Sequence, residues 1–266
     1  MRMLEVGPGV DVGAALAGSD VLAIAGGDGS VHHLAPTAAA AGVPIYHIPC
    51  GNENLLAREF GMDDAPGTLR RALDAWDVRR MDVADYDLNG VPGMFLLMCS
   101  FGPDASVIHR LAAARTRPMG HAAYFEPVLR ELLAPRYARL SVLVDGEAVV
   151  AHEPGVLLIA NSRQYALRVD PASRAEVNDG LLDIVFLPCS SRWGVAAWGL
   201  RSRLRRHHDH PRLIYRRARV IEIATDSGPM PFQLDGERPG CSGGIVERSM
   251  RIEVRPGALP VLVPPR

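Results

Sequence analysis

Short apolar runs alternate with helix-like stretches over the first 80 residues of the chain. Residues 21–25 form a continuous apolar run that ends in a cluster of glycines, and residues 43–48 form a second run closed by Pro and Gly. Runs of this length, bounded by glycine, are typical of buried strands in a parallel sheet. The segments 31–41, 53–60 and 66–76 favour helices. This order predicts a doubly wound α/β lobe with both strand-end loops at the carboxyl edge of its sheet.

The pattern changes near Met81, where short strand-like stretches separated by turn residues take over. The predicted strands are 93–99, 138–144, 155–160, 181–186, 219–224 and 230–234. Two predicted helices, 103–115 and 120–133, interrupt them. We therefore expect an N-terminal lobe over 1–80 and a mainly antiparallel β-rich lobe over 81–247. The tail, 248–266, carries two strand-like pieces that can join either lobe.

Composition narrows the class of protein. The 29 Lys and Arg nearly balance the 30 Asp and Glu, so no global field favours nucleic acid, and no nucleic-acid motif is present. Four widely separated cysteines form no CxxC pair, which argues against zinc and disulfide frameworks and fits a reducing compartment. There is no signal-peptide pattern and no apolar run of about 18 residues. We expect a cytoplasmic protein whose membrane contact, if it has any, is peripheral.

The most informative stretch is the first glycine loop, Gly26-Gly27-Asp28-Gly29-Ser30. Its glycines let the backbone bend closely, so that successive N–H groups converge on an anion beside a helix N-terminus. Asp28 adds a carboxylate, which suits Mg²⁺ or the removal of a proton from a hydroxyl. The alternative is a plain strand-to-helix turn in which Asp28 caps the helix.

A second loop, 49–54, follows the next predicted strand and contains Gly51, Asn52 and Asn54. If the sheet is parallel, this loop lies beside the first. Alone it is a weak signal, because Asn and Gly are common turn and cap residues. Neither loop matches a Walker motif or GxGxxG, so phosphate would be held by backbone, metal and distant basic residues.

The ordered motifs resemble the catalytic family of diacylglycerol kinases, which includes sphingosine and ceramide kinases and bacterial lipid kinases. The matching segments follow the family's order and extend from about residue 21 to the C-terminus. They are GGDGT at 26–30, PxGTxN at 49–54, GFDA at 101–105, GxxxY at 120–124, DGLLDV at 179–184 and DGE at 235–237.

The resemblance implies a Rossmann-like N-terminal lobe with a parallel sheet, an antiparallel β-sandwich C-terminal lobe, and a fold related to NAD kinases. It implies ATP and Mg²⁺ as cofactors, bound between the lobes, and a lipid acceptor that enters through the C-terminal lobe. Asp28, Asp235 and Glu237 would act as base or Mg²⁺ ligands. The implied nucleotide contacts are Gly26, Gly27, Gly29, Ser30, Gly51, Asn52, Asn54 and Arg117.

The chain departs from the family pattern in its N-terminal part. The family opens with a βα unit carrying NPxSG, whereas only 25 residues without that motif precede Gly26. One wall of the nucleotide site is then missing or supplied by another segment or chain. The Glu that can contact nucleotide is replaced by His33. Together with His32 and His47, this residue can serve a different acid/base chemistry near neutral pH, or simply fill a helix start and a strand.

Three functions remain open at this point. The first is transfer of the ATP γ-phosphate to a hydroxyl of a lipid or amphiphilic small molecule. The second is a non-kinase acid/base enzyme, without ATP or another cofactor, acting on a small molecule in the inter-lobe cleft. The third is a non-catalytic lipid-binding or regulatory protein.

Two further surfaces suggest partners. Residues 192–206 combine arginines with Trp and Leu, which suits peripheral contact with an anionic membrane or, alternatively, a solvated helix. A sheet edge left open by the missing βα unit suggests a homodimer.

Overall fold

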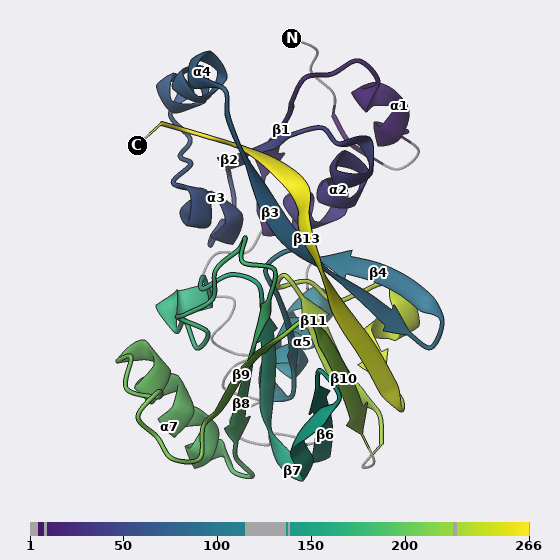
Figure 1. The fold of residues 1–266 in the computed structure, drawn as a ribbon, viewed down its shortest axis with the longest axis vertical. Helices are drawn as coiled ribbons and strands as arrows, with labels where there is room; N and C mark the ends of the chain where they lie inside the picture. Colours follow the sequence, from purple (N-terminus) through teal and green to yellow (C-terminus); the bar gives the residue numbers. More distant parts are fainter. Residues whose placement is uncertain (1–4, 8–9, 115–136, 138, 226–227, 266) are drawn as a thin grey trace. The chain divides into compact units, whose positions relative to one another are not determined.

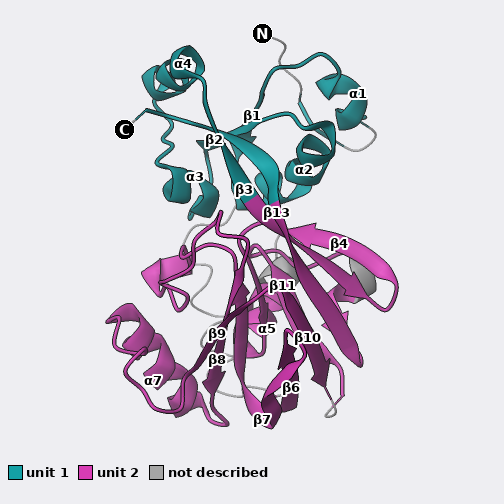
Figure 2. Cartoon of the chain, viewed as in Figure 1, with its two compact units in different colours: residues 1–81, 257–266 teal, residues 82–256 magenta. Residues whose placement is uncertain are grey.

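The structure is a computed structural model that describes residues 5–7, 10–114, 137, 139–225 and 228–265. Its chain divides into two compact units, residues 1–81 with 257–266, and residues 82–256 (Figure 2). The predicted helix over 120–133 lies outside the described residues. No helix in the described ranges is both long enough and apolar enough to cross a bilayer.

The first unit is an α/β layer built on parallel strands (Figure 1). Strands β1 and β2 pair in parallel from Leu22 opposite Ile45 to Gly26 opposite Pro49, and the end of β13 joins β2 in parallel at Val261. Among the described strands β1 pairs with β2 alone, and dimerisation through a sheet edge stays a prediction. The elements are α1 Val12–Leu16, β1 Leu22–Gly26, α2 Asp28–Ala41, β2 Ile45–Pro49, α3 Leu55–Phe60 and α4 Pro66–Ala75.

Glycine and proline residues set several of the helix ends in this unit. Helix α2 has Gly27 as its N-cap and ends at Gly42, which takes the left-handed conformation that glycine favours. It begins at Asp28, three residues earlier than the pattern predicted, because the last residues of the glycine loop already form its first turn. Helix α4 starts with Pro66 at its first position, where the missing N–H costs nothing.

The second unit is mainly antiparallel β structure. Strands β3 and β13 each contribute residues to both units. The remaining elements are β3 Asp77–Leu88, β4 Val91–Phe95, β5 Met98–Phe101, α5 Pro103–Ala114, β6 Arg139–Val144, β7 Glu147–Ala160, β8 Leu182–Pro188, α7 Arg192–Arg203, β9 Ile214–Ala218, β10 Val220–Thr225, β11 Met230–Leu234, β12 Ile245–Val246 and β13 Ser249–Val263, with 3-10 turns Ala166–Arg168 and Cys241–Gly244.

Strand β7 joins two layers of strands in this unit. Its first half, through Pro154, pairs with β6, whereas its second half, from Gly155, pairs with β8 and, from Leu157, with β5. A Cβ on Gly155 would lie 2.6 Å from the ring of Phe186, so only glycine fits at this change of partner. The aromatic core of the unit includes Phe101 stacked on Phe232 with ring centroids 5.9 Å apart.

The β unit differs from the sequence prediction in several details, among them the length of β7, which was predicted only over 155–160. The expected strand 93–99 is broken into β4 and β5 at Leu96 and Leu97. Strands β3 and β9 were not predicted, because their charged residues hide the strand pattern. The two strand-like pieces of the tail form one long strand, β13, whose parts belong to different units.

Candidate functional site

The two glycine-containing loops of the first unit lie side by side at the carboxyl ends of β1 and β2. The backbone N–H of Cys50 donates to the carbonyl of Gly26 over 2.9 Å. A Cβ added to Gly51 would lie 2.7 Å from the Cα of Gly27, closer than any real contact. At Gly27 and Gly51 the loops therefore touch backbone to backbone, and this is the packing reason for glycine at both positions.

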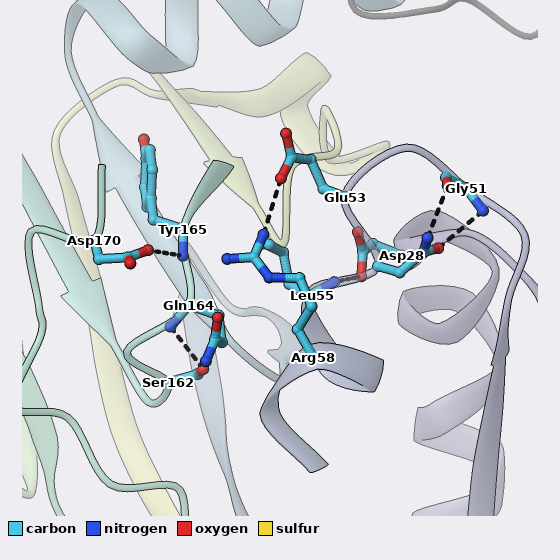
Figure 3. Close-up of polar contacts among 10 residues, drawn as sticks. Asp28, Gly51, Glu53, Leu55, Arg58, Ser162, Gln164, Tyr165 and Asp170 are labelled. Carbon is cyan, nitrogen blue, oxygen red and sulfur yellow. Dashed lines mark hydrogen bonds and ion pairs between the residues drawn. The ribbon is translucent and has the colours of Figure 1, made fainter. Parts of the chain in front are cut away.

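Asp28 connects the two loops. It is the first residue of α2, and its Oδ1 accepts the backbone N–H of Leu55 over 2.6 Å (Figure 3). Leu55 is the first residue of α3, whose N-cap, Asn54, makes no side-chain cap. The carboxylate thus caps one helix while standing at the N-terminus of another, where negative charge is stabilised. Its predicted role as base or Mg²⁺ ligand stays a prediction.

Asn54 fixes the shape of the second loop. Its Oδ1 accepts the N–H of Gly51 over 2.8 Å, and its Nδ2 donates to the carbonyl of Gly51 over 2.7 Å. Its backbone adopts a left-handed φ of 49°, which Asn tolerates better than most residues. Asn52 is exposed on the same loop. Ser30 packs over the first loop, because a Cβ on Gly26 would meet its Oγ at 2.4 Å.

An ion pair that the sequence did not reveal lies beside this loop. Arg58 Nη1 is 2.9 Å from Glu53 Oε2, and both side chains are only 17% exposed (Figure 3). Arg58 lies in the last turn of α3. Reduced exposure makes such a pair stronger than a surface ion pair, so it steadies the start of α3.

The three histidines of the first unit have different settings. His47 is fully buried on β2, with Nε2 2.9 Å from the carbonyl oxygen of Gly26. A carbonyl only accepts, so Nε2 carries the proton and donates. Burial lowers the pKa of His47, although the Gly26 carbonyl opposes this shift. His47 thereby supports the glycine loop as a neutral side chain, while His32 and His33 lie edge to face in the first turns of α2. Acid/base roles for all three remain predictions.

In the second unit, Asp235 is tied to the chain at the break between β4 and β5. Its carboxylate accepts the N–H groups of Leu96, Leu97 and Met98 over 2.9, 2.7 and 3.0 Å, and the residue is 3% exposed. This carboxylate explains why the predicted strand is interrupted, because it takes N–H groups that a neighbouring strand would otherwise pair. Its predicted role as base or Mg²⁺ ligand stays a prediction.

Asp235 and Gly236 form a two-residue turn with φ angles of 52° and 83°, the combination of a type I′ hairpin. Glu237 closes this turn through its backbone N–H, which donates to the carbonyl of Leu234 over 2.8 Å. The side chain of Glu237 is half-buried. The turn residues Asp-Gly carry the family motif and also meet the conformational demand of the turn.

A buried polar network that the sequence did not reveal reaches the same turn. The amide of Gln233 donates to Ser100 Oγ and accepts from the N–H of Gly236, each over 2.7 Å. Ser100 donates in turn to Asp104, whose carboxylate also accepts the hydroxyl of Tyr165 over 2.7 Å. Burial raises the pKa of Asp104 although both hydroxyl groups oppose this shift. Asp104 stood in a recognised motif, and Ser100 is four residues away, but Tyr165 is 61 residues away in sequence.

Asn161 also binds the segment between β4 and β5, but as a hydrogen-bond donor, whereas Asp235 is an acceptor. Its Nδ2 donates to the carbonyls of Asp82 and Leu96, each over 2.7 Å, and the residue is fully buried. Asp235 thus takes the N–H groups of this segment while Asn161 takes a carbonyl. In the loop that follows, Tyr165 N–H donates to Asp170 (Figure 3).

The first loop fits a phosphate group. Helix α2 is 14 residues long and has a glycine N-cap that supplies no side-chain cap, which is the arrangement that binds phosphate at helix N-termini. Among the described residues no group of three or more His, Cys, Asp or Glu side chains is placed to hold a metal ion. Mg²⁺ that is shared with nucleotide phosphates needs only one or two protein carboxylates. Arg117 and the segment 120–124 lie outside the described residues.

Comparison with known proteins gives matches over both units. Residues 12–86 match the diacylglycerol kinase catalytic domain, and residues 98–263 match the YegS C-terminal NAD kinase beta sandwich-like domain. A probable YegS-like lipid kinase from Pseudomonas fluorescens is 31% identical, over 94% of this chain and 80% of the relative. The diacylglycerol kinase of Mycobacterium tuberculosis is 29% identical over 66% of this chain, and the match spans only 57% of the relative's length.

Solved structures share the fold. A diacylglycerol kinase from Bacillus anthracis has a TM-score of 0.64 at 17% identity, covering 94% of this chain and 79% of the other. Yeast NADH kinase complexed with NADH has a TM-score of 0.50 at 10% identity, covering 93% and 62%. The predicted fold class, a Rossmann-like α/β lobe with an antiparallel β-sandwich of NAD-kinase type, is confirmed. The chain belongs to the family of diacylglycerol kinases and YegS-like lipid kinases.

Proposed function

We propose that this protein is a phosphotransferase that moves the γ-phosphate of ATP to a hydroxyl of a lipid or amphiphilic small molecule. The observation that carries the proposal is the pair of touching glycine loops with Asp28 at the N-termini of two helices. The names of the relatives support a lipid acceptor. ATP bound at these loops supplies the phosphoryl group, and Mg²⁺ offsets its charge.

The residues of the first unit would hold and orient the phosphates. The backbone N–H groups at the start of α2 lie at the positive end of the helix dipole, where they can donate to phosphate oxygens. Gly27 and Gly51 place no side chain at this end of the helix. In the transfer, the acceptor hydroxyl would lose its proton and its oxygen would bond to the γ-phosphorus, while the bond from that phosphorus to the bridging oxygen of ADP would break. Among the carboxylates, Asp28 is our candidate for the proton or the metal, because Asp235 already accepts three backbone N–H groups.

The substitution Asp28→Asn tests this assignment. Asparagine keeps a side-chain oxygen that can accept the N–H of Leu55, but it removes the negative charge. We expect turnover of ATP with a diacylglycerol or similar acceptor to fall by about 100-fold or more, the usual range for loss of a general base. The melting temperature should stay close to that of the wild type.

Asp11→Asn is the matched control, because Asp11 also accepts a backbone N–H at a helix start, from Ala14 over 2.9 Å, in the same unit. This variant should keep full turnover. Wild-type turnover in Asp28→Asn would contradict the role of Asp28.

Calorimetric titration with a non-hydrolysable ATP analogue and Mg²⁺ tests the nucleotide itself. Micromolar binding supports the phosphotransferase, and the acceptor is then sought among diacylglycerols, sphingoid bases and other amphiphilic alcohols. Absence of binding up to millimolar concentration contradicts it and favours the acid/base enzyme without ATP.

A further inference from the structure

Helix α7 has one apolar face packed on the protein and a second one exposed. The packed face centres on Trp198, which is 5% exposed and whose indole N–H donates to the carbonyl of Pro188 over 3.1 Å. Ser202, one turn further on, is also buried. The helix is anchored at its start by Ser191, whose hydroxyl accepts the N–H of Gly194. The attachment of α7 to the second unit therefore needs only this face.

The opposite face carries large apolar side chains in contact with solvent. Trp193, Leu200 and Leu204 are 71%, 62% and 57% exposed. Trp193 and Leu200 are seven residues apart, which places them on one stripe of α7, and Leu204, the C-cap residue, follows directly after the last turn. Leu200 lies two positions after Trp198, about 200° around a helix of 3.6 residues per turn, so the stripe faces away from the packed side.

Arginines flank the stripe. The exposed guanidinium groups belong to Arg192, Arg201, Arg203, Arg205 and Arg206, and the sequence between 190 and 208 contains no Asp or Glu. None of the five forms an ion pair with another residue that the structure describes. Three exposed arginines elsewhere do pair with a nearby carboxylate: Arg70 with Asp74, Arg79 with Asp77 and Arg251 with Glu253. Arg192 and Arg201 instead lie over Trp193 and Trp198, 5.2 and 6.0 Å from the ring centroids.

We propose that the exposed face of α7, together with the residues that follow its last turn, docks on the surface of a bilayer that contains anionic lipids. This surface consists of Trp193, Leu200, Leu204 and the five arginines. An apolar stripe bordered by cations matches the boundary between acyl chains and phosphate headgroups, with Trp at the depth it favours. A polyanion such as nucleic acid would use the arginines but would leave the leucine side chains in water. The proposal does not rest on phosphotransfer, because docking needs no turnover.

Vesicle co-sedimentation of the full chain tests docking directly. We expect binding to phosphatidylcholine vesicles containing phosphatidylglycerol, weak binding to phosphatidylcholine alone, and loss of binding at high salt. Replacing Arg201, Arg203, Arg205 and Arg206 by Gln should lower the partition coefficient by about 100-fold or more, since each cation near the surface contributes roughly fivefold to tenfold. The triple variant Trp193→Ser, Leu200→Ser, Leu204→Ser should lose binding comparably.

Matched controls carry the same chemistry elsewhere on the surface. Four exposed arginines, Arg70, Arg79, Arg219 and Arg251, are changed to Gln, and three exposed apolar residues, Leu73, Trp76 and Val91, are changed to Ser. Both control variants should bind vesicles as the wild type does. Equal loss in either control, or equal wild-type binding to neutral vesicles, would overturn the proposal.

The fluorescence of Trp193 gives a second readout. In a Trp76→Phe background, binding to anionic vesicles should shift the emission to shorter wavelength and make it quenchable by brominated acyl chains. Trp198 is buried and should not respond. Retention on single-stranded DNA through the same arginines, without vesicle binding or a spectral shift, would replace the membrane by nucleic acid as the partner.

Discussion

At the scale of single residues, the site depends on two glycines, which have no Cβ atom, and on two polar side chains. Gly27 and Gly51 allow two loops from different strands to touch, and Asp28 and Asn54 then hold the loops with one and two hydrogen bonds. The sequence alone predicted that these residues would meet, because parallel strands place consecutive loops on one edge. It could not predict that Asp28 caps the second helix, since the partner is 27 residues away.

Gly51→Ala should separate the loops. The new Cβ would lie 2.7 Å from the Cα of Gly27 and 2.9 Å from Asn54 Oδ1, so backbone has to move. We expect a loss of about 1–3 kcal/mol in the free energy of unfolding, measured by urea denaturation. Gly199→Ala is the control, because a Cβ there meets nothing within 4 Å in the middle of α7. That change should be neutral or stabilise by up to about 1 kcal/mol; a Gly51→Ala protein as stable as this control would contradict the close contact.

Asp235→Asn should destabilise the second unit. The amide group of asparagine would bring N–H against one of the three backbone N–H groups that the carboxylate accepts. Loss of charged hydrogen bonds in a buried place is expected to lower the free energy of unfolding by about 2–4 kcal/mol.

Asp87→Asn is the comparison for this variant, because Asp87 is exposed and accepts a single N–H, from Gly90 over 2.8 Å. We expect a cost below about 1 kcal/mol there. Wild-type stability in Asp235→Asn, measured by chemical denaturation, would show that the carboxylate is not structural and would strengthen its assignment to chemistry.

At the scale of elements, some strands could be predicted from the pattern of apolar residues and others could not. Strand β11 was predicted with correct bounds, because Met230, Phe232 and Leu234 alternate along it and form an apolar face. Strand β9 carries Arg216 and Arg217 and was missed, yet it pairs along its length with β8. The break after β4 was missed for another reason: its residues are all apolar, and the carboxylate that interrupts the strand is contributed by a residue about 140 positions later. Such long-range causes leave no local trace.

Helix α7 also belongs to this scale. Its residues predicted a basic and aromatic helix, but the sequence did not say which face is packed. The structure buries Trp198 and exposes Trp193, a distinction set by the hydrogen bond from the indole of Trp198 to Pro188. The vesicle experiments above test the consequence of that choice.

At the scale of the whole molecule, buried histidines make stability depend on pH. Burial lowers the pKa of His47, His109 and His207, and lowers the pKa of His208 to about 4. An unfolded histidine has a pKa of about 6.5, so below that pH the unfolded chain binds more protons than the native one. These groups therefore stabilise the fold above about pH 6.5, and their contribution is lost as the pH falls.

The raised pKa of Asp183 changes the stability of the fold with pH in the opposite direction. Burial raises its pKa to about 6, although the hydroxyl of Tyr215 donates to it over 2.6 Å and opposes the shift. Its contribution is present below the unfolded pKa of about 4 and is lost as the pH rises through 6. The two effects oppose each other between about pH 4 and 6, and above pH 6 the histidines dominate.

His208→Gln isolates one histidine. Gln can keep a hydrogen bond to Ser173, which lies 2.8 Å from His208 Nε2, but cannot gain a proton. Urea midpoints measured at pH 7.0, 6.0 and 5.0 should fall less steeply for this variant than for the wild type. His33→Gln, at an exposed position, should follow the wild-type curve. Parallel pH curves for His208→Gln and the wild type would contradict the assignment.

The way the first unit is assembled from two distant segments has a consequence for the order of synthesis. Residues 257–266 complete this unit, and Val261 pairs with Ile45 on β2. A ribosome releases these residues only after the whole second unit has emerged. The sheet that carries the glycine loops therefore stays incomplete until residues 257–266 have been made. The usual order, in which the N-terminal unit folds first, does not hold for this unit. A nascent chain arrested before residue 257 should expose the loops to protease long after the second unit has become resistant.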